Sequence, residues 1–270
     1  MGLGPWNALH RGVRIVDDSK TPRDFVRGLS MQGFVRHFII PLARKHDWKS
    51  FCEIGASKGV STDEILKLPI TSYMIIDPCF DADLALKYAD DVRVSVSKRN
   101  SLDALPNVAI TFDCILIDGD HNWYTVFNEL RLIRERSLLH AGGMVFFHDV
   151  GWPYERRDMY YQPDTIPTEF LQRYERKGIV KGQGALADHG GSYEEVCNAV
   201  HEGGPRNGVL TAIEDFIAEH PTEYQFSRVK LGSGLGILQY RRKLSSEDAS
   251  FFLLRIKAGI YSLAGRVSGK

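Results

Sequence analysis

The sequence has no excess of charge of either sign. Its 270 residues include 34 Lys and Arg against 34 Asp and Glu, so the formal net charge is zero. Proteins that bind nucleic acid through its phosphates usually carry a basic excess. The charge balance therefore argues against nucleic acid as the main partner.

Cysteine is scarce, and long apolar runs are missing. The four cysteines form no CxxC pair and have no suitably spaced histidine, which speaks against a zinc site and predicts buried, reduced thiols. No apolar run reaches the roughly 20 residues of a membrane span. Residues 1–14 hold no apolar stretch of signal-peptide length. We therefore expect a soluble, cytoplasmic protein without a membrane span.

Internal repeats and low-complexity tracts are also absent from the sequence. Between residues 47 and 150, short apolar runs alternate with stretches of helical periodicity. This alternation predicts an α/β fold with a mostly parallel sheet and helices on both faces. A terminal hairpin, antiparallel to the sheet, is expected further along the chain. The expected strands are 50–54, 73–76, 92–96, 112–117, 144–147, 224–231 and 234–241, and the expected helices are 62–68, 83–89, 123–139 and 208–219.

The regions outside this core have a different texture. Residues 1–46 read as an N-terminal helical segment, with two short helices broken near Gly33. Residues 151–207, inside the main domain of 47–242, are weak in periodicity, which is typical of a substrate lid. Residues 243–270 predict an amphipathic helix that docks on the core or a second subunit, or lies on a membrane surface. The N-terminal helices and this tail are candidates for a homodimer interface.

Two acidic positions near a glycine turn suggest a nucleotide-like ligand. In the run 53–59, a strand delivers Glu53, a turn with Gly55 and Gly59 follows, and a helix begins. Glycine lets a ligand approach the backbone closely. Asp77 ends the next strand, about 20 residues on, where an acidic side chain can accept hydrogen bonds from ribose hydroxyls. Together they predict an adenosine-containing cofactor at the carboxyl ends of the first two strands.

Two further polar groups follow apolar strands. Asp118, Asp120 and His121 come directly after the strand 112–117, and His148 and Asp149 follow the strand 144–147. Carboxyl ends of adjacent parallel strands are where open α/β sheets bind ligands. Three carboxylates and two imidazoles suit Mg²⁺ or another hard divalent cation. We therefore expect a functional cluster there.

These motifs resemble those of the class I S-adenosylmethionine-dependent methyltransferases, from about residue 32 to 241. The runs 112–121 and 142–150 look like the subgroup acting on small molecules, such as macrolide sugars and other natural products, and like the metal-dependent catechol-type O-methyltransferases. The resemblance implies a Rossmann-like, doubly wound, seven-stranded sheet. It implies cofactor contacts from Glu53, Gly55, Ala56, Ser57, Gly59, Asp77, Ser101, Leu102 and Asp118.

The resemblance also implies roles in catalysis. Asp118 matches a metal-binding aspartate of the catechol-type enzymes, whose Asp–Asn pair is replaced here by His148 and Asp149, so His148 is a departure. His121 stands where related enzymes place a base, Asp120 is expected to orient it or to complete the metal shell, and His148 is a further candidate catalytic residue. A cation, Mg²⁺ by preference, held by Asp118, His148 and Asp149 would lower the pKa of an acceptor hydroxyl.

The insertion offers side chains that suit a partly apolar, hydroxylated ring substrate, or that simply pack the insertion on the core. These are Trp152, Tyr154, Arg156, Tyr160 and Tyr161. Two alternative functions stay open at this point. One is an NAD(P)-dependent oxidoreductase, although Gly55 and Gly59 do not complete a GxGxxG turn. The other is a non-catalytic protein that binds an adenosine ligand.

Overall fold

The computed structural model describes residues 30–78 and 82–241. The C-terminal helix expected over 243–270, and the part of the N-terminal helical segment before residue 30, lie outside these residues. Within them, no helix has the length and apolar character that crossing a membrane requires. Cys52, Cys114 and Cys197 are buried and free, as expected, and Cys79 lies outside the described residues.

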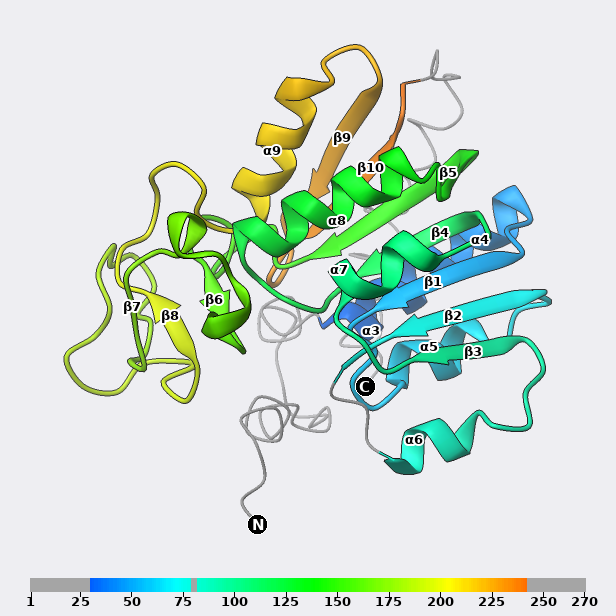
Figure 1. Cartoon of the computed structure of the whole chain (residues 1–270), viewed down its shortest axis with the longest axis horizontal. Helices are drawn as coiled ribbons and strands as arrows, with labels where there is room; N and C mark the ends of the chain where they lie inside the picture. Colours follow the sequence, from blue (N-terminus) through cyan, green and yellow to red (C-terminus); the bar gives the residue numbers. More distant parts are fainter. Residues whose placement is uncertain (1–29, 79–81, 242–270) are drawn as a thin grey trace, which may run out of the picture.

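A seven-stranded mixed sheet forms the centre of the molecule, in the order β3-β2-β1-β4-β5-β10-β9 (Figure 1). Its first five strands run parallel: β1 (Ser50–Ile54), β2 (Ser72–Ile76), β3 (Val94–Ser97), β4 (Phe112–Ile117) and β5 (Leu139–His148). β9 (Tyr224–Val229) and β10 (Leu235–Tyr240) form the predicted hairpin. β10 runs antiparallel to both of its neighbours, β5 and β9. β9 therefore runs in the same direction as the five parallel strands.

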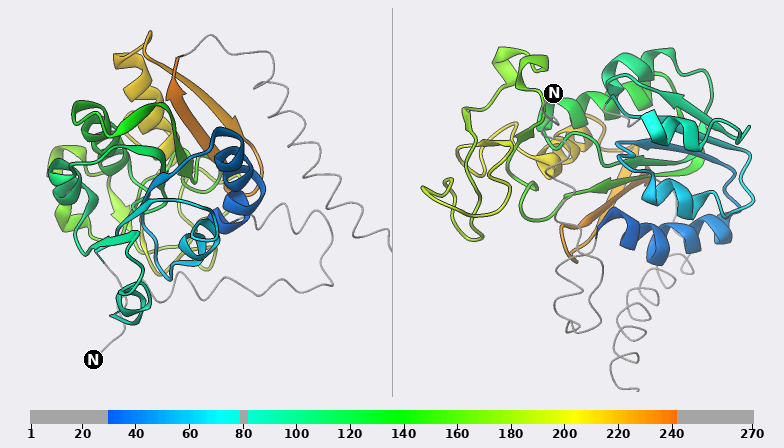
Figure 2. Two further views of the ribbon diagram at one scale, coloured as in Figure 1. Left: turned by 90° about the vertical axis from the view of Figure 1, so that its right-hand side faces the viewer. Right: turned by 90° about the horizontal axis from the view of Figure 1, so that it is seen from below.

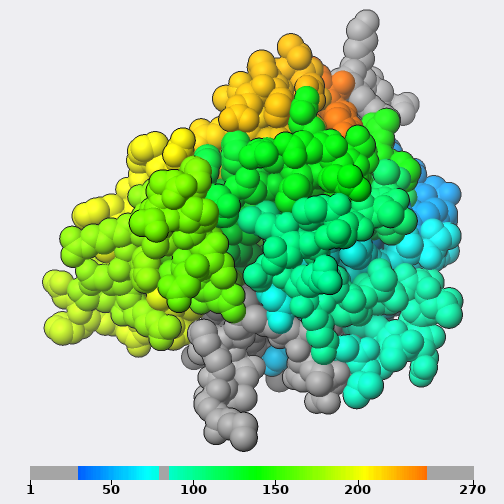
Figure 3. Space-filling view, in the orientation of Figure 1, coloured from blue at the N-terminus to red at the C-terminus, as the bar shows by residue number. Residues whose placement is uncertain are grey.

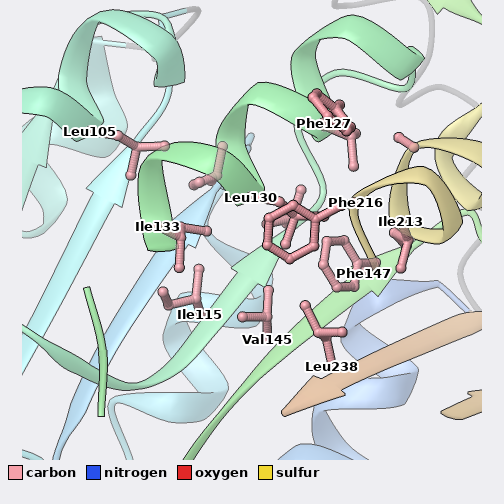
Figure 4. Packing of buried hydrophobic residues seen from close by; sticks show 14 of the residues in the cluster. Leu105, Ile115, Phe127, Leu130, Ile133, Val145, Phe147, Ile213, Phe216 and Leu238 are labelled. Carbon is pink, nitrogen blue, oxygen red and sulfur yellow. The ribbon is translucent and has the colours of Figure 1, made fainter. Parts of the chain in front are cut away.

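Apolar residues alternate between the two faces of the sheet and build two separate cores. One face is covered by α3 (Met31–Phe34), the π-helical η2 (Val35–Ile39), α4 (Ile40–His46) and α5 (Val60–Ile65). The other is covered by α7 (Ser101–Ala104), η3 (Leu105–Asn107), α8 (Trp123–Glu135) and α9 (Val209–Glu219). Figure 4 shows this second core, where Ile115, Val145 and Phe147 of the sheet meet Leu130 and Phe216.

Two helix predictions need correction. The expected break near Gly33 is absent, because Gly33 lies inside α3 and the helical path runs unbroken from Met31 to His46. The buried stripe that includes Phe34 and Phe38 outweighs the roughly 1 kcal/mol that glycine costs in a helix. The helix expected over 123–139 ends at Glu135, because Ser137 takes a left-handed φ of 51° and Leu139 already begins β5.

The insertion has more structure than its sequence texture indicates. A second, three-stranded sheet of order β6-β8-β7 is formed by β6 (Met159–Tyr160), β7 (Tyr174–Glu175) and β8 (Cys197–Ala199). The short 3-10 helices η4 (Pro163–Thr165) and η5 (Thr168–Phe170) complete it, and α6 (Ala82–Lys87) lies elsewhere, beside β3. Figures 1 and 2 show this small sheet beyond the end of β5. The insertion therefore stands next to the edge where we expected the site.

Candidate functional site

The turn after β1 is wedged against the turn after β4. Gly55 has a left-handed φ of 86°, and a Cβ atom there would meet the carbonyl oxygen of Asp118 at 2.4 Å. The amide of Gly55 donates to Ile76 O at 3.0 Å, and that of Asp118 donates to Ile54 O at 2.9 Å. Only glycine fits this conformation and this space. Gly55 therefore brings three strand ends together.

Asp77 ties the end of β2 to the same turn. Its side chain is 1% exposed, and its Oδ2 accepts a hydrogen bond from the amide of Ser57 at 2.7 Å. Ser57 adopts a left-handed φ of 50°, which points its amide at the carboxylate. This hydrogen bond fixes the position of the Asp77 carboxylate at the carboxyl edge of the sheet.

A cavity of about 360 Å³ opens at this edge. Volumes of about 300–1,000 Å³ are typical of small-molecule sites. Among the predicted residues its lining includes Gly55, Asp77, Ser101, Leu102 and Asp120. Further lining residues come from α8 and the insertion: Tyr124, Thr125, Glu129, Tyr161, Gln162, Thr165 and Ile166. Figure 3 shows a recess between the insertion and the region around residue 100.

Other predicted cofactor residues lie apart from the cavity lining. Glu53 is buried in the core, where its Oε2 accepts hydrogen bonds from Thr62 Oγ1 at 2.5 Å and Tyr73 Oη at 2.6 Å. Burial raises the pKa of Glu53 to about 7 against the effect of these two donors. Ala56, Ser57, Gly59 and Asp118 are likewise not part of the lining. Gly59 instead begins α5 with a φ of 70°.

The second pair of motifs forms one compact cluster. Asp118, His121, His148 and Asp149 each offer one ligand atom, and these four atoms lie within 4.8 Å of one another. His148 Nδ1 is 3.0 Å from Asp118 Oδ1 and 3.1 Å from Asp149 Oδ2. His121 Nε2 is 3.0 Å from Asp149 Oδ2 and 3.6 Å from Asp118 Oδ1. The strand ends of β4 and β5 therefore bring together the residues that we expected to meet.

The charges of the cluster are strongly coupled. Although burial opposes the charged form, the carboxylates of Asp118 and Asp149 raise the pKa of His148 well above its usual value. The same two carboxylates raise the pKa of His121 against burial. In turn, the imidazoles hold the pKa of the Asp118 carboxyl well below its usual range, although burial acts in the opposite direction. Two carboxylates thus attract positive charge to this point, as protons or as a cation.

Residues distant in sequence fix the orientation of the two imidazoles. Ser233 Oγ, in the turn between β9 and β10, lies 2.8 Å from His148 Nε2, so that Nδ1 faces the carboxylates. The ring of Tyr154 stacks on that of His121 with centroids 5.4 Å apart and planes 6° apart. Asp149 takes a left-handed φ of 56°, which turns its side chain back toward the cluster.

Asp120 faces away from the cluster. Its Oδ2 accepts hydrogen bonds from Asn122 Nδ2 at 2.6 Å and from Thr125 Oγ1 at 2.8 Å. Burial raises its pKa against these donors. Asp120 is therefore part of the cavity wall and the start of α8, and these bonds do not hold the ring of His121.

The aromatic side chains of the insertion divide into two groups. Tyr154 is buried against His121, and Tyr161 both lines the cavity and lies 6.1 Å from the His121 ring centroid to centroid. Tyr160 and Arg156 serve the structure instead: Tyr160 donates to Asp158 Oδ2, and Arg156 pairs with Glu214 of α9. Tyr161 thus connects the cavity with the cluster.

Two positions have no motif to mark them in the sequence, whereas His121, expected as a base, also lies within ligand distance of the predicted metal residues. Ser233 is 85 residues from the histidine that it contacts, and no motif marks it. Glu129 lies within an amphipathic helix, where glutamate normally faces solvent, but it is fully buried in the cavity wall. The four-residue spacing from Thr125 to Glu129, on one face of α8, was the available signal.

Comparisons with known proteins agree with this architecture. Residues 52–150 match the model of a methyltransferase-domain family. The fold matches an S-adenosylhomocysteine-bound methyltransferase of Podospora anserina with a TM-score of 0.50, 16% identity, and coverage of 88% of this chain and 86% of that one.

Two further solved structures are also similar. A Staphylococcus aureus protein assigned as a caffeoyl-CoA O-methyltransferase has 15% identity and a TM-score of 0.46, over 87% of this chain and 89% of that one. The N-methyltransferase NodS of Bradyrhizobium japonicum, with bound S-adenosylhomocysteine, has 12% identity and a TM-score of 0.46, over 89% and 100%. A search of curated proteins finds no match. The matched segment begins within β1 and ends just after β5, so the part of the chain that carries the strand-end motifs is similar to a methyltransferase domain.

Proposed function

We propose that the protein is an O-methyltransferase that methylates a hydroxyl of a small molecule, with a divalent cation held by Asp118, His148 and Asp149 of the Asp118–His121–His148–Asp149 cluster. The observation that carries this proposal is that cluster, set beside a cavity that can hold the cofactor. The similarity of residues 52–150 to a methyltransferase domain supports a methyl-donor cofactor over the nicotinamide cofactor of an oxidoreductase. A purely adenosine-binding protein would have no use for four converging metal-ligand groups.

The cavity supports the placement of the cofactor. Along the carboxyl edge of the sheet the order is Asp118 after β4, Gly55 after β1, Asp77 after β2 and Ser101 after β3. Gly55 leaves room for close backbone approach, and Asp77 offers a buried carboxylate to ribose hydroxyls. The methionine part would then lie near Gly55, the ribose near Asp77 and the adenine toward Ser101. In this order, the reacting end of the cofactor would lie nearest the cluster.

The donor set fits a hard divalent cation. Two carboxylates and two imidazoles converge within 4.8 Å, and each member is buried or half-buried. Oxygen-rich sites with some imidazole suit Mg²⁺ and Mn²⁺. Asp118, His148 and Asp149 would hold the ion, and Ser233 would fix the ring of His148. A bound cation lowers the pKa of a coordinated acceptor hydroxyl, which makes the oxygen a better nucleophile.

His121 is the group best placed to take the proton. Its Nε2 faces the centre of the cluster, and Asp149 Oδ2, at 3.0 Å, stabilises the imidazolium that would form. The Tyr154 ring holds the plane of the imidazole. The carboxylates raise the pKa of His121, which favours the imidazolium, and positive charge in the cluster would restore the neutral form that accepts a proton.

The insertion supports a partly apolar acceptor. Tyr154, Tyr161 and Trp152 belong to or pack on one apolar group next to the cluster. Aromatic walls with few charges suit a ring that carries a hydroxyl, and they exclude water from the reacting oxygen. We propose the insertion as the segment that encloses this acceptor and distinguishes it from others.

The decisive experiment combines binding and turnover. Calorimetric titration of the full chain with S-adenosylhomocysteine, with and without Mg²⁺ or Mn²⁺, should show binding of both. A screen of hydroxylated natural products and sugars by mass spectrometry should then find a product heavier by one methylene, and excess EDTA should abolish it. Full activity in excess EDTA would contradict the proposal that a divalent cation takes part in the reaction. Products methylated only on nitrogen would overturn the hydroxyl acceptor.

The role of His121 has a matched test. His121→Ala should lower turnover about 100-fold and leave the affinity for S-adenosylhomocysteine unchanged within a few-fold. His140→Ala serves as the control, since His140 is exposed at the start of β5, at the far end from the cluster. An equal loss of cofactor affinity in His121→Ala would contradict the base role.

A further inference from the structure

One buried carboxyl group in the cavity wall is poorly satisfied by the residues that the structure describes. Glu129 lies on α8, is 0% exposed and lines the cavity together with Ser101 and Leu102. Among residues 30–78 and 82–241, neither carboxyl oxygen makes a hydrogen bond of ordinary geometry, although the Ser101 hydroxyl lies close enough to act on its charge. Because an unsatisfied buried polar group is costly, such groups usually serve a purpose in the liganded state.

The surroundings of Glu129 call for a neutral hydrogen-bonding ligand. Burial raises its pKa to about 8, the Ser101 hydroxyl opposes this effect, and the Asp120 carboxylate adds to it. No cationic side chain is among the groups that act on its charge. A neutral carboxyl can accept one hydrogen bond and donate another, side by side.

The position of Glu129 along the cavity identifies the part of the ligand it meets. Ser101 follows β3, which is two strands away from Gly55 and one strand beyond Asp77. If the ribose is held at Asp77, the group that reaches Ser101 and Glu129 is the base. α7 and α8 contact each other (Figure 1), and both contribute to the cavity lining, α7 through Ser101 and Leu102 and α8 through Glu129, so the base edge would lie between two helices.

We infer that Glu129 recognises the amino edge of the cofactor's adenine, accepting a hydrogen bond from its exocyclic amino group. This inference rests on the cofactor site proposed above. The adenine ring nitrogen next to that amino group accepts a hydrogen bond from the protonated Glu129 carboxyl. The Ser101 hydroxyl lies beside these two hydrogen bonds. Glu129 is then a specificity-determining residue that selects adenine over a purine without the amino group.

The test compares two ligands on two variants. S-adenosylhomocysteine and its analogue with hydrogen in place of the amino group are titrated into the full chain by calorimetry. The wild-type protein should prefer S-adenosylhomocysteine about 10- to 100-fold. Glu129→Leu should lower this ratio to about 1–3, chiefly by weakening the binding of S-adenosylhomocysteine. Glu129→Gln, whose amide can also accept and donate, should keep most of the preference.

Controls separate recognition from folding. Because Glu129→Leu removes a poorly satisfied buried carboxyl, its unliganded melting temperature should equal or exceed that of the wild type. Glu135→Leu, on the exposed end of the same helix, should leave the ligand ratio unchanged. If Glu129→Leu binds S-adenosylhomocysteine and keeps the wild-type ratio, the inference fails and the proposed function stands. If the wild type binds neither ligand, the proposed function fails as well.

Discussion

The sheet and the insertion contrast in how they are held together. In the sheet, alternate apolar side chains on each strand form two cores, one on either face. In the insertion, strands of two or three residues carry only small apolar clusters, and buried polar hydrogen bonds help to join them to the main domain. Apolar packing tolerates similar side chains, whereas each buried hydrogen bond needs one particular donor and acceptor. The contrast suggests that the insertion depends on fewer and less replaceable residues.

Asp158 is the most important of those residues. Its Oδ1 accepts from the amides of Trp123 at 2.8 Å and Gly208 at 2.6 Å, and its Oδ2 accepts from Tyr160 Oη at 2.7 Å. One buried carboxyl thus joins the start of α8, the start of α9 and β6.

Removing this carboxyl should have the largest effect on stability. Asp158→Ala leaves three buried donors without an acceptor, so the free energy of unfolding should fall by about 4 kcal/mol. Asp164→Ala, an exposed aspartate of the same insertion, should change it by less than about 0.5 kcal/mol. Urea unfolding followed by circular dichroism measures both, and a loss below 1 kcal/mol in Asp158→Ala would refute this view of the insertion.

Two glycines with the same backbone φ, one in the main domain and one in the insertion, test how closely the chain packs in each region. Gly55 in the main domain and Gly182 in the insertion both have φ of 86°, but a Cβ on Gly55 meets backbone at 2.4 Å and one on Gly182 meets nothing within 4 Å. Gly182→Ala should cost about 1 kcal/mol of unfolding free energy, from the conformation alone. Gly55→Ala should cost about 3 kcal/mol and weaken S-adenosylhomocysteine binding. Equal costs in thermal unfolding would contradict the close approach.

The cation site should be separable from the cofactor site. Asp118→Asn removes one charged ligand, and we expect Mn²⁺ affinity to fall about 100-fold while S-adenosylhomocysteine affinity changes only a few-fold. Asp188→Asn, exposed on the insertion, is the matched control. Mn²⁺ binding is followed by electron paramagnetic resonance. Unaltered Mn²⁺ affinity in Asp118→Asn would place the cation elsewhere.

The last expected effect is a dependence of stability on pH that comes from Glu53 in the first core. Its pKa is raised from about 4.3 in the unfolded chain to about 7 in the folded one, so the folded state binds the extra proton between these values. The free energy of unfolding should therefore fall as pH rises from about 4 to 7, by roughly 1 kcal/mol per pH unit from this group.

Glu53→Gln carries no such proton. Relative to the wild type, its unfolding free energy should rise with pH across that window and stay level above about pH 8. Chemical unfolding at five pH values gives the comparison. Parallel curves for the two proteins would show that Glu53 is ionised in the folded state.

The parts of the fold that the sequence predicted are those whose pattern is local. β1 and β4 have the predicted bounds, because buried parallel strands are short apolar runs with polar residues at their ends. The break predicted at Gly33 was wrong, because a helix propensity of about 1 kcal/mol yields to a stripe of buried aromatic residues. The small sheet of the insertion left no periodic signal, since two-residue strands cannot show alternation.

The candidate site was likewise predictable only where its residues follow a local pattern. Asp118, His148 and Asp149 meet because carboxyl ends of neighbouring parallel strands share an edge, which is a topological rule. Glu129 and Ser233 were missed because their roles depend on which turn of a helix or hairpin faces the cavity or the cluster. Such placements are tertiary, and a single sequence does not encode them in any nearby pattern.

The hairpin at residues 224–240 also sets an order of events during synthesis. Its turn supplies Ser233, whose carbonyl accepts from Gly151 at 2.6 Å and whose hydroxyl meets His148. β10 also covers the edge of β5. At a synthesis rate of about 5–20 residues per second, the ribosome completes β5 several seconds before it completes β10. During that interval the β5 edge has no neighbouring strand and His148 lacks its hydroxyl partner, so the proposed cation site would be completed only late in the synthesis of each molecule.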